Sequence, residues 1–239
     1  MILHRVIFSV EKTLQMRQTA PMTEKTKTAL VTGASRGLGY ATALKLSENG
    51  YHIIAVARTL GGLEELADVV EGNNKSITVA AMDVTNEQNL QQLCLSIFER
   101  WGHLDLLVHC ASHAPLLTPA TQVTAKDFDT TFNTNARATS RIIALTESLL
   151  RVAPNGKAVF INDPCAGGQF SGAYGASKAA ANSLVESWIK ETKNLKPVVS
   201  LFTPNPMPTA TRARFFPGED KSKLSSPHTE AERLIASIL

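Results

Sequence analysis

The chain is predicted to form one α/β domain in which a doubly wound parallel sheet is covered by helices on both faces. Three observations predict this class. From Thr28 onward, short β-branched runs alternate with longer segments of helical periodicity. The 239 residues, 44% of them apolar, are enough for one sizeable core. The sequence also contains no internal repeat and no low-complexity segment.

The elements follow in order along the chain. Strands are expected at residues 28–32, 52–57, 76–82, 104–109, 157–162 and 197–203. Helices are expected between them, at residues 37–48, 60–70, 87–101, 125–150 and 173–193. Right-handed crossovers then place a ligand site at the carboxyl ends of the strands. After Pro204 the sequence is rich in proline and irregular, which predicts a mobile lid with a short helix, followed by a last helix at about residues 229–239.

Residues 1–27 are interpreted as a flexible N-terminal extension that precedes the domain of residues 28–239. The extension carries five basic and two acidic side chains, so the remaining 19 basic and 19 acidic residues balance. The body therefore lacks the charge that is typical of nucleic-acid-binding proteins. A transit peptide is one interpretation of the extension, and a native start at Met22 is the favoured one.

The cysteine content indicates the compartment. Three cysteines at scattered positions are too few for a disulfide framework, which favours a reducing environment. No apolar run approaches the roughly 20 residues that span a bilayer. We expect a cytoplasmic protein with no membrane partner, while import into an organelle by the basic N-terminus stays open.

A glycine-rich turn predicts a dinucleotide site. The segment TGASRGLG, residues 32–39, follows the first predicted strand directly and opens a helix. Glycines at 33, 37 and 39 would let the chain turn sharply and bring backbone N–H groups and the helix N-terminus against a pyrophosphate. A glycine triplet alone is a weak signal, and its place between a strand and a helix makes it specific.

Two arginines favour NADP(H) over NAD(H). Arg58 ends the second strand, where an NAD-binding site usually has an acid, and Arg36 lies in the glycine turn. Together they could clamp a 2′-phosphate, although two solvated arginines are the alternative. Asp83, at the end of the third strand, is placed either to contact the adenine or to cap the next helix.

Three segments, TGASRGLG, LDLLVHCAS and YGASK, resemble the short-chain dehydrogenase/reductase family in their order and spacing, and the resemblance covers roughly residues 28–209. It implies a Rossmann-like fold and a nicotinamide cofactor, and it leaves the substrate open. It also implies that Asn135, Tyr174 and Lys178 are catalytic and that Thr209 contacts the nicotinamide amide. The expected cofactor-binding residues are Gly33, Ser35, Arg36, Gly37, Leu38, Gly39, Arg58, Asp83, Val84, Cys110, Ala111, Tyr174, Lys178 and Thr209.

The chain also departs from the family's pattern. The family's NNAG is replaced by HCAS, residues 109–112, and the proline-glycine after the sixth strand becomes Pro204 and Asn205. Aligning the AG of PCAG with the family's Ser-x-x-Gly places Pro164 at the catalytic serine. The chain stops at Leu239, where the family usually adds a seventh strand, and this leaves a sheet edge exposed or covered by another segment or subunit.

Hydride transfer to a carbonyl requires a proton for the developing alkoxide, and Tyr174 is the expected acid and base. A free tyrosine has a pKa of about 10, so a base that works near neutrality needs about 4 kcal/mol of extra stabilisation of the phenolate. Lys178, one turn further along the same helix, is placed to supply it through its charge. An amphipathic helix without catalytic meaning is the alternative. The resemblance further implies that Asn135 holds a water that links Lys178 to solvent.

The proline at position 164 has neither a hydroxyl nor an N–H to donate. Loss of one oxyanion donor costs about 2.7–4 kcal/mol, so the reaction would be slowed rather than abolished. We expect Ser171 to orient the substrate instead, with Asn162 and Asp163 as alternatives.

The sequence therefore predicts an NADP(H)-dependent oxidoreductase that interconverts a carbonyl and a secondary alcohol, with Tyr174 as acid and base. The alternative is a catalytically impaired or inactive nucleotide-binding protein of the same fold. The expected partners are a small carbonyl or alcohol substrate and further copies of the chain, as a dimer or tetramer. No metal site is expected, because His109 and His113 beside Cys110 lack a third ligand.

Overall fold

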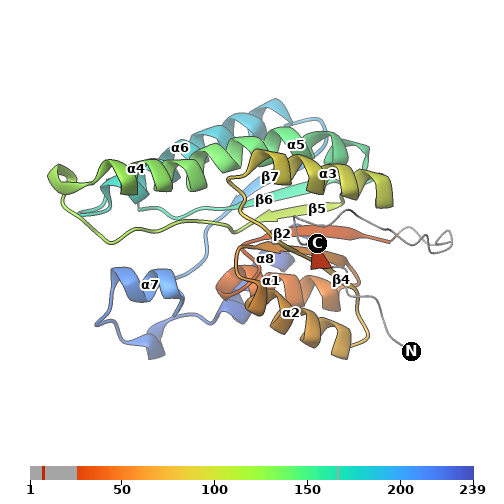
Figure 1. The fold of residues 1–239 in the computed structure, drawn as a ribbon, viewed down its shortest axis with the longest axis horizontal. Helices are drawn as coiled ribbons and strands as arrows, with labels where there is room; N and C mark the ends of the chain where they lie inside the picture. Colours follow the sequence, from red (N-terminus) through yellow and green to blue (C-terminus); the bar gives the residue numbers. More distant parts are fainter. Residues whose placement is uncertain (1–6, 9–25, 166) are drawn as a thin grey trace.

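The computed structural model describes residues 7–8, 26–165 and 167–239, and its centre is a parallel sheet (Figure 1). The six main strands are β2 Thr28–Thr32, β3 His52–Ala57, β4 Ile77–Ala81, β5 Leu106–His109, β6 Lys157–Ile161 and β7 Val198–Phe202. With β1 Ile7–Phe8 beside β4, the strand order is β1-β4-β3-β2-β5-β6-β7, and every pairing is parallel. The predicted doubly wound, Rossmann-like sheet is confirmed.

Helices of the described chain cover both faces of the sheet (Figure 1). The face shown below the sheet carries α1 Gly37–Glu48, α2 Leu60–Gly72 and α8 Pro227–Ile238. The face shown above it carries α3 Glu87–Trp101, α4 Ala125–Phe132, α5 Ala138–Val152 and α6 Gly172–Glu191. A further short helix, α7 Ala210–Phe215, lies apart from both layers, in the predicted lid, and two single 3-10 turns are η1 Ala120–Gln122 and η3 Lys221–Lys223.

The central strands are buried on both faces. Every residue of β2, β3 and β5 is buried. Along β2, Leu30 packs into the core under α3, α5 and α6, while its neighbour Val31 packs into the core under α1, α2 and α8. Successive side chains of a strand point to opposite faces, so a strand between two helical layers must be apolar throughout.

The helix predicted at residues 125–150 is divided by a π turn, η2 Asn133–Arg137, which joins α4 to α5 without a break. A π turn accommodates an extra residue in the helix and is frequent at functional sites. Periodicity over a whole window does not reveal one extra residue, which is why the sequence indicated a single helix.

The N-terminal extension lies mostly outside the described residues. The described residues of the extension are 7–8 and 26–27, and Ile7 and Phe8 pair with Val79 and Ala80 of β4. The interpretation of residues 1–27 as a flexible extension stays a prediction. Two-residue pairing depends on the free edge of β4 more than on local sequence, which explains why no pattern signalled it.

At the opposite edge, no strand of the described residues borders the outer side of β7. The edge begins at Val198, whose side chain is largely exposed. Among the described helices, none combines the length and the apolar character that a membrane crossing requires.

Candidate active site

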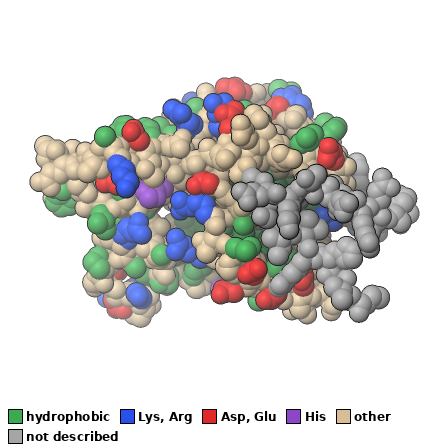
Figure 2. Space-filling view, viewed as in Figure 1, with side chains coloured by type: hydrophobic (Ala, Val, Ile, Leu, Met, Phe, Trp, Pro, Cys, Tyr) green, Lys and Arg blue, Asp and Glu red, His purple; other side chains and the backbone are tan. Residues whose placement is uncertain are grey.

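The carboxyl ends of the strands open into a cleft of about 1140 Å³ that the lid partly covers. It is lined by the glycine turn, by the segments after β3, β4, β5 and β6, by α6 and by the chain from Pro204 to α7. In the space-filling view, Lys and Arg side chains gather between the upper helical layer and the lid (Figure 2). All the residues that the sequence assigned to cofactor binding line this cleft.

The glycine turn has a backbone shape that only glycine allows. Gly33 and Gly37 have φ values of +69° and +60°, in the left-handed region that side chains disfavour. A Cβ at Gly33 would lie 2.9 Å from the backbone nitrogen of Ala111, and one at Gly39 would lie 2.3 Å from the Gly33 carbonyl oxygen. The turn therefore packs strand, helix and neighbouring loop in close contact.

The N-terminus of α1 fits a pyrophosphate. The side chain of its N-cap residue, Arg36, makes no capping hydrogen bond, and the first turn holds no acidic residue. Its leading N–H groups are thus left for an external acceptor, and the helix dipole favours an anion there. Arg36 and Arg58 are both exposed on the cleft, where a phosphate could reach them.

Asp83 lines the same cleft, and one of its two predicted roles is wrong. Its Oδ1 accepts a hydrogen bond from the backbone N–H of Thr85 at 2.8 Å, in a turn that precedes α3. The residue that caps α3 is Asn86, whose side chain accepts from Asn89 N at 3.0 Å. Capping of the helix by Asp83 is excluded, and contact with an adenine stays a prediction.

Thr209 lies against the glycine turn. Its Cγ2 is 3.5 Å from the position that a Cβ on Gly37 would take. Its hydroxyl caps α7 by accepting from the N–H of Arg212 at 3.3 Å. The threonine thus joins the start of the lid helix to the expected path of the cofactor.

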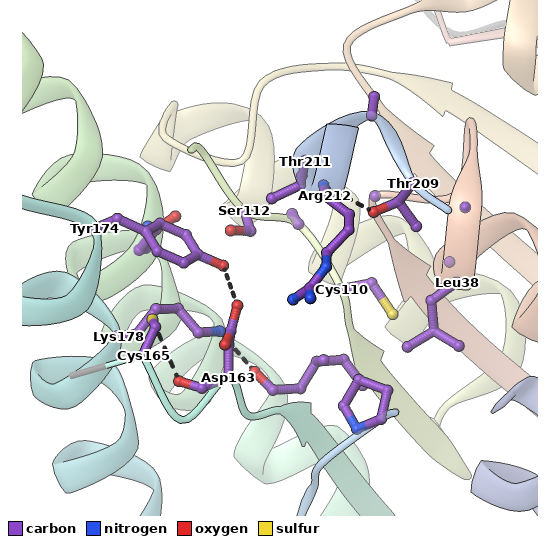
Figure 3. A pocket seen from close by; sticks show the side chains of 18 of the residues that line it. Leu38, Cys110, Ser112, Asp163, Cys165, Tyr174, Lys178, Thr209, Thr211 and Arg212 are labelled. Atoms are coloured by element: carbon purple, nitrogen blue, oxygen red, sulfur yellow. Dashed lines mark hydrogen bonds between the residues drawn. The ribbon is translucent and has the colours of Figure 1, made fainter. Parts of the chain in front are cut away.

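Tyr174 and Lys178 project from α6 into the cleft beside Asp163 (Figure 3). The Tyr174 hydroxyl donates to Oδ2 of Asp163 at 3.0 Å, and Nζ of Lys178 donates to the carbonyl oxygen of Ile161 at 2.6 Å. The helical spacing does bring the phenol and the ammonium group to one place. The partner in contact with the phenol, however, is a carboxylate.

Burial and this carboxylate give the Tyr174 pKa a shift opposite to the expected one. Burial raises the pKa of Tyr174 most, and the charge of Asp163 and the hydrogen bond to it raise it further, while a hydrogen bond from Ser112 opposes the shift. Burial also lowers the pKa of Lys178, and the charge of Asp163 partly restores it. The expected phenolate stabilised by Lys178 is therefore replaced by a phenol that holds its proton firmly.

The loop after β6 differs from the sequence alignment. Pro164 is exposed at the cleft, and Asp163 is the residue that touches the tyrosine. Ser171 is buried, and its hydroxyl lies 2.9 Å from the Cys165 carbonyl oxygen and 2.7 Å from that of Gly168. The single hydroxyl proton of Ser171 is thus engaged within the loop, a geometry that does not support its predicted role of orienting a substrate.

Asn135 lies in the π turn and bridges two parts of the site. Its Oδ1 accepts from the N–H of His113 at 2.7 Å, and its Nδ2 lies 2.9 Å from both the His113 carbonyl oxygen and Oγ of Ser177. The side chain is buried and connects the loop after β5 to α6. Its predicted water link to Lys178 stays a prediction.

The HCAS segment at the end of β5 serves partly as core. His109 lies 2.7 Å from the hydroxyl of Thr32, and burial lowers its pKa to about 3, so that it is neutral. Burial likewise raises the pKa of Cys110 to about 12, which keeps it a thiol. Ser112 is the member that reaches Tyr174, and it takes the place of a glycine in the family's pattern.

Sequence reasoning gave Ser112 no role and named Asp163 only as an alternative to Ser171. Arg212 reaches into the cleft from α7 (Figure 3) and is held by two hydrogen bonds to Glu219, at 2.6 and 2.5 Å, and by the ring of Phe216, 4.0 Å away. Of these residues, only Asp163 could have been recognised from the sequence, because it comes just after a parallel strand and ligands bind at the carboxyl ends of such strands.

A glycine turn at a free helix N-terminus, facing a Tyr-Lys pair on a later helix, defines a dinucleotide-binding α/β protein of the oxidoreductase type. Residues 27–220 match the family model described as short chain dehydrogenase. Because this match covers most of the chain, the protein belongs to the short-chain dehydrogenase/reductase family.

Relatives and solved structures agree with this family. An uncharacterized oxidoreductase of Staphylococcus epidermidis is 30% identical over 189 residues, which is 77% of this chain and 80% of the relative. The NADPH-dependent pterin aldehyde reductase of Arabidopsis thaliana is 27% identical over 89% of this chain and 88% of its own. A short chain dehydrogenase structure from Shigella flexneri, complexed with NADP, has a TM-score of 0.79 at 26% identity, covering 84% of this chain and 86% of that chain.

Proposed function

We propose that this protein is an NADP(H)-dependent oxidoreductase that reduces its substrate with Tyr174 as the proton donor. The observation that carries the proposal is the projection of Tyr174 and Lys178 from one helix into a cleft that begins at the glycine turn. The NADP in the Shigella flexneri structure and the NADPH dependence named for the Arabidopsis relative support the same cofactor.

Each part of the cleft has a role in this proposal. The glycine turn and the first N–H groups of α1 hold the pyrophosphate, Arg36 and Arg58 hold the 2′-phosphate, and Asp83 contacts the adenine. When bound, the cofactor supplies a hydride to the substrate. Tyr174 provides the proton: burial and Asp163 raise its pKa, so the phenol is in the protonated form that a general acid needs. Thr209 and α7 close the site from the lid.

A turnover assay tests the proposal. NADPH oxidation is followed over a panel of aldehydes, ketones and imines, with wild-type protein and with Tyr174→Phe. Removal of a general acid typically costs a factor of about 10²–10⁴ in rate. We expect the variant to bind NADPH with unchanged affinity, measured by cofactor fluorescence, and to lose activity on this scale. Equal rates for the two proteins would contradict the role of Tyr174.

A second candidate is a nucleotide-binding protein without turnover. The hydrogen bond from Tyr174 to Asp163 favours it, since a carboxylate beside the site disfavours the alkoxide that carbonyl reduction produces. NADPH binding with no oxidation across the whole panel would support this candidate. The cytoplasmic location and the dimer or tetramer remain predictions, which imaging of a tagged full-length chain and sedimentation would test.

A further inference from the structure

A carboxylate lies where the reacting group of a substrate must approach. Asp163 follows β6, is partly exposed, and lines the cleft with Oδ2 at 3.0 Å from the Tyr174 hydroxyl. Any group that takes a proton from Tyr174 has to come within hydrogen-bond distance of this hydroxyl. Such a group is then a close neighbour of the Asp163 charge.

The other charges near Tyr174 do not cancel the attraction of the Asp163 carboxylate for a cation. Lys178 faces Asp163 from α6 and donates to a backbone carbonyl, and the two charges are opposite. Arg212 faces Asp163 from the lid, but its guanidinium group is paired with Glu219 through two hydrogen bonds. The four groups together carry no net charge. Arg36 and Arg58 lie at the cofactor end of the same cleft, so the balance holds only around Tyr174, where the charged group in contact with the phenol is negative.

The sign of this charge matters for the chemistry. Reduction of a carbonyl places negative charge on oxygen, and a neighbouring carboxylate opposes it. A protonated carbon–nitrogen double bond is a cation, which a carboxylate attracts through a charge-assisted hydrogen bond. The same contact raises the proton affinity of a bound imine nitrogen, and the protonated imine is the form that accepts a hydride.

We propose, on the basis of the proposed function, that Asp163 selects substrates whose reacting group is a protonated imine in preference to neutral aldehydes and ketones. In this reduction the carbon of the C=N bond gains a hydride, the C–N π pair becomes the lone pair of the nitrogen, and the reduced nicotinamide dinucleotide is oxidised. An imine that binds neutral takes its proton from Tyr174 before the hydride arrives, and one that binds protonated needs none, so either route leaves a neutral amine.

Ligand binding tests the selection without any turnover. Calorimetry on the full chain without cofactor compares tetrahydroisoquinoline, a cationic amine at neutral pH, with tetralol, a neutral alcohol of the same bicyclic shape. We expect the amine to bind at least tenfold more tightly. Asp163→Asn and Asp163→Ser should each remove this preference and leave the affinity for tetralol within twofold. Asp129→Asn, at an exposed position on α4, removes the same charge elsewhere and should change neither affinity.

Turnover provides the second comparison, with NADPH and the matched pair dihydroisoquinoline and tetralone. We expect wild-type protein to reduce the imine faster than the ketone, and Asp163→Ser to reverse this order. Equal affinity of the wild-type protein for amine and alcohol, including no measurable affinity for either, overturns the inference, as does an amine preference that survives in both Asp163 variants. Failure of the proposed function is seen separately, as absence of NADPH binding, and does not alter the calorimetric result.

Discussion

At the scale of single residues, the acid in contact with Tyr174 decides what the phenol can do. The Tyr-Lys spacing provides a cation near a phenol, which in isolation would lower the pKa of the phenol. Burial and the Asp163 carboxylate act in the opposite direction and dominate. The Asp163 carboxylate lies 3.0 Å from the phenol, whereas the Lys178 ammonium group is bonded to the Ile161 carbonyl oxygen. Charge interactions weaken with distance, so the carboxylate has the larger influence on the phenol.

The state of Tyr174 can be measured directly. We expect Tyr174 to stay protonated well above about pH 10, where an ordinary tyrosine ionises, because both burial and the Asp163 charge disfavour the phenolate. Asp163→Asn should shift the titration of Tyr174 to lower pH. Ultraviolet absorbance of ionised tyrosine, with the Tyr174→Phe spectrum subtracted, measures both. A titration unchanged by Asp163→Asn would show that the carboxylate has no influence on the phenol.

The choice of cofactor is also a property of single residues. Replacing Arg36 and Arg58 together by serine should weaken NADPH binding by at least tenfold and leave NADH binding almost unchanged, because a hydrogen bond to a charged group contributes about 1.5–3 kcal/mol. Fluorescence titration with both cofactors measures this. Arg151→Ser, at an exposed position of α5, is the control. Equal losses for NADPH and NADH would mean that the arginines do not recognise the 2′-phosphate.

At the scale of elements, the close contact between α2 and the glycine turn explains a pair of adjacent glycines. Gly61 and Gly62 both lie in the first turns of α2. A Cβ on Gly61 would meet nothing within 4 Å, whereas one on Gly62 would lie 2.5 Å from the carbonyl oxygen of Ser35. The second glycine thus lets the helix approach the cofactor turn, and the first has no such role.

This pair offers a matched test of packing. Gly61→Ala should raise the free energy of unfolding by about 0.5–1 kcal/mol, the usual gain for alanine over glycine in a helix. Gly62→Ala has the same intrinsic gain but must displace Ser35, so it should lower the free energy of unfolding and weaken NADPH binding. Chemical denaturation and cofactor titration measure the two effects. If both variants were equally stable, the close approach of α2 to the turn would be disproved.

At the scale of the whole molecule, α8 ties the end of the chain to the segment after β7. Glu230 on α8 is fully buried and accepts from the N–H of Asn205 at 3.0 Å and from its Nδ2 at 2.9 Å, and Arg233 pairs with the same carboxylate. Asn205 stands where the family has a glycine, and its side chain is used in this contact. Asn205 is the first residue of the lid, so this contact anchors the lid to the domain.

The contact predicts a pH dependence of stability. Burial opposes ionisation of Glu230, but its hydrogen bonds to Ser225 and Asn205 and the Arg233 charge prevail and lower its pKa. A lowered pKa in the folded state stabilises the fold above the pKa of the unfolded chain, about 4.3, and this stabilisation is lost as the pH falls through the folded-state value. Glu230→Gln should therefore cost about 1–3 kcal/mol at pH 7 and progressively less below about pH 4.

Urea denaturation at several pH values measures this difference. The control is Glu232→Gln, two residues further along the same helix, where the carboxylate is bonded to Lys45 at the surface. This variant should change the free energy of unfolding by less than about 1 kcal/mol at every pH. A constant difference between wild type and Glu230→Gln across the pH range would rule out ionisation of Glu230 as its cause.

The sequence alone determined the sheet, the cofactor turn and the Tyr-Lys pair. These features are local: a strand run, a glycine triplet between strand and helix, and two residues one helical turn apart each depend on neighbours in the chain. The alternation of such segments and the right-handed crossover rule then decide the topology. The fold and the cleft could be predicted for this reason, and so could the residues that line it, whose role in cofactor binding stays a prediction.

Only the tertiary structure decided what surrounds the phenol. An alignment placed Pro164 at the reactive position, but the folded chain brings Asp163 to Tyr174 and engages the Ser171 hydroxyl with the carbonyl oxygens of Cys165 and Gly168. Ser112 and Arg212 reach the same point from distant segments. Whether a buried phenol gains or loses acidity depends on these through-space neighbours and on burial, and neither quantity is encoded in the local spacing of residues.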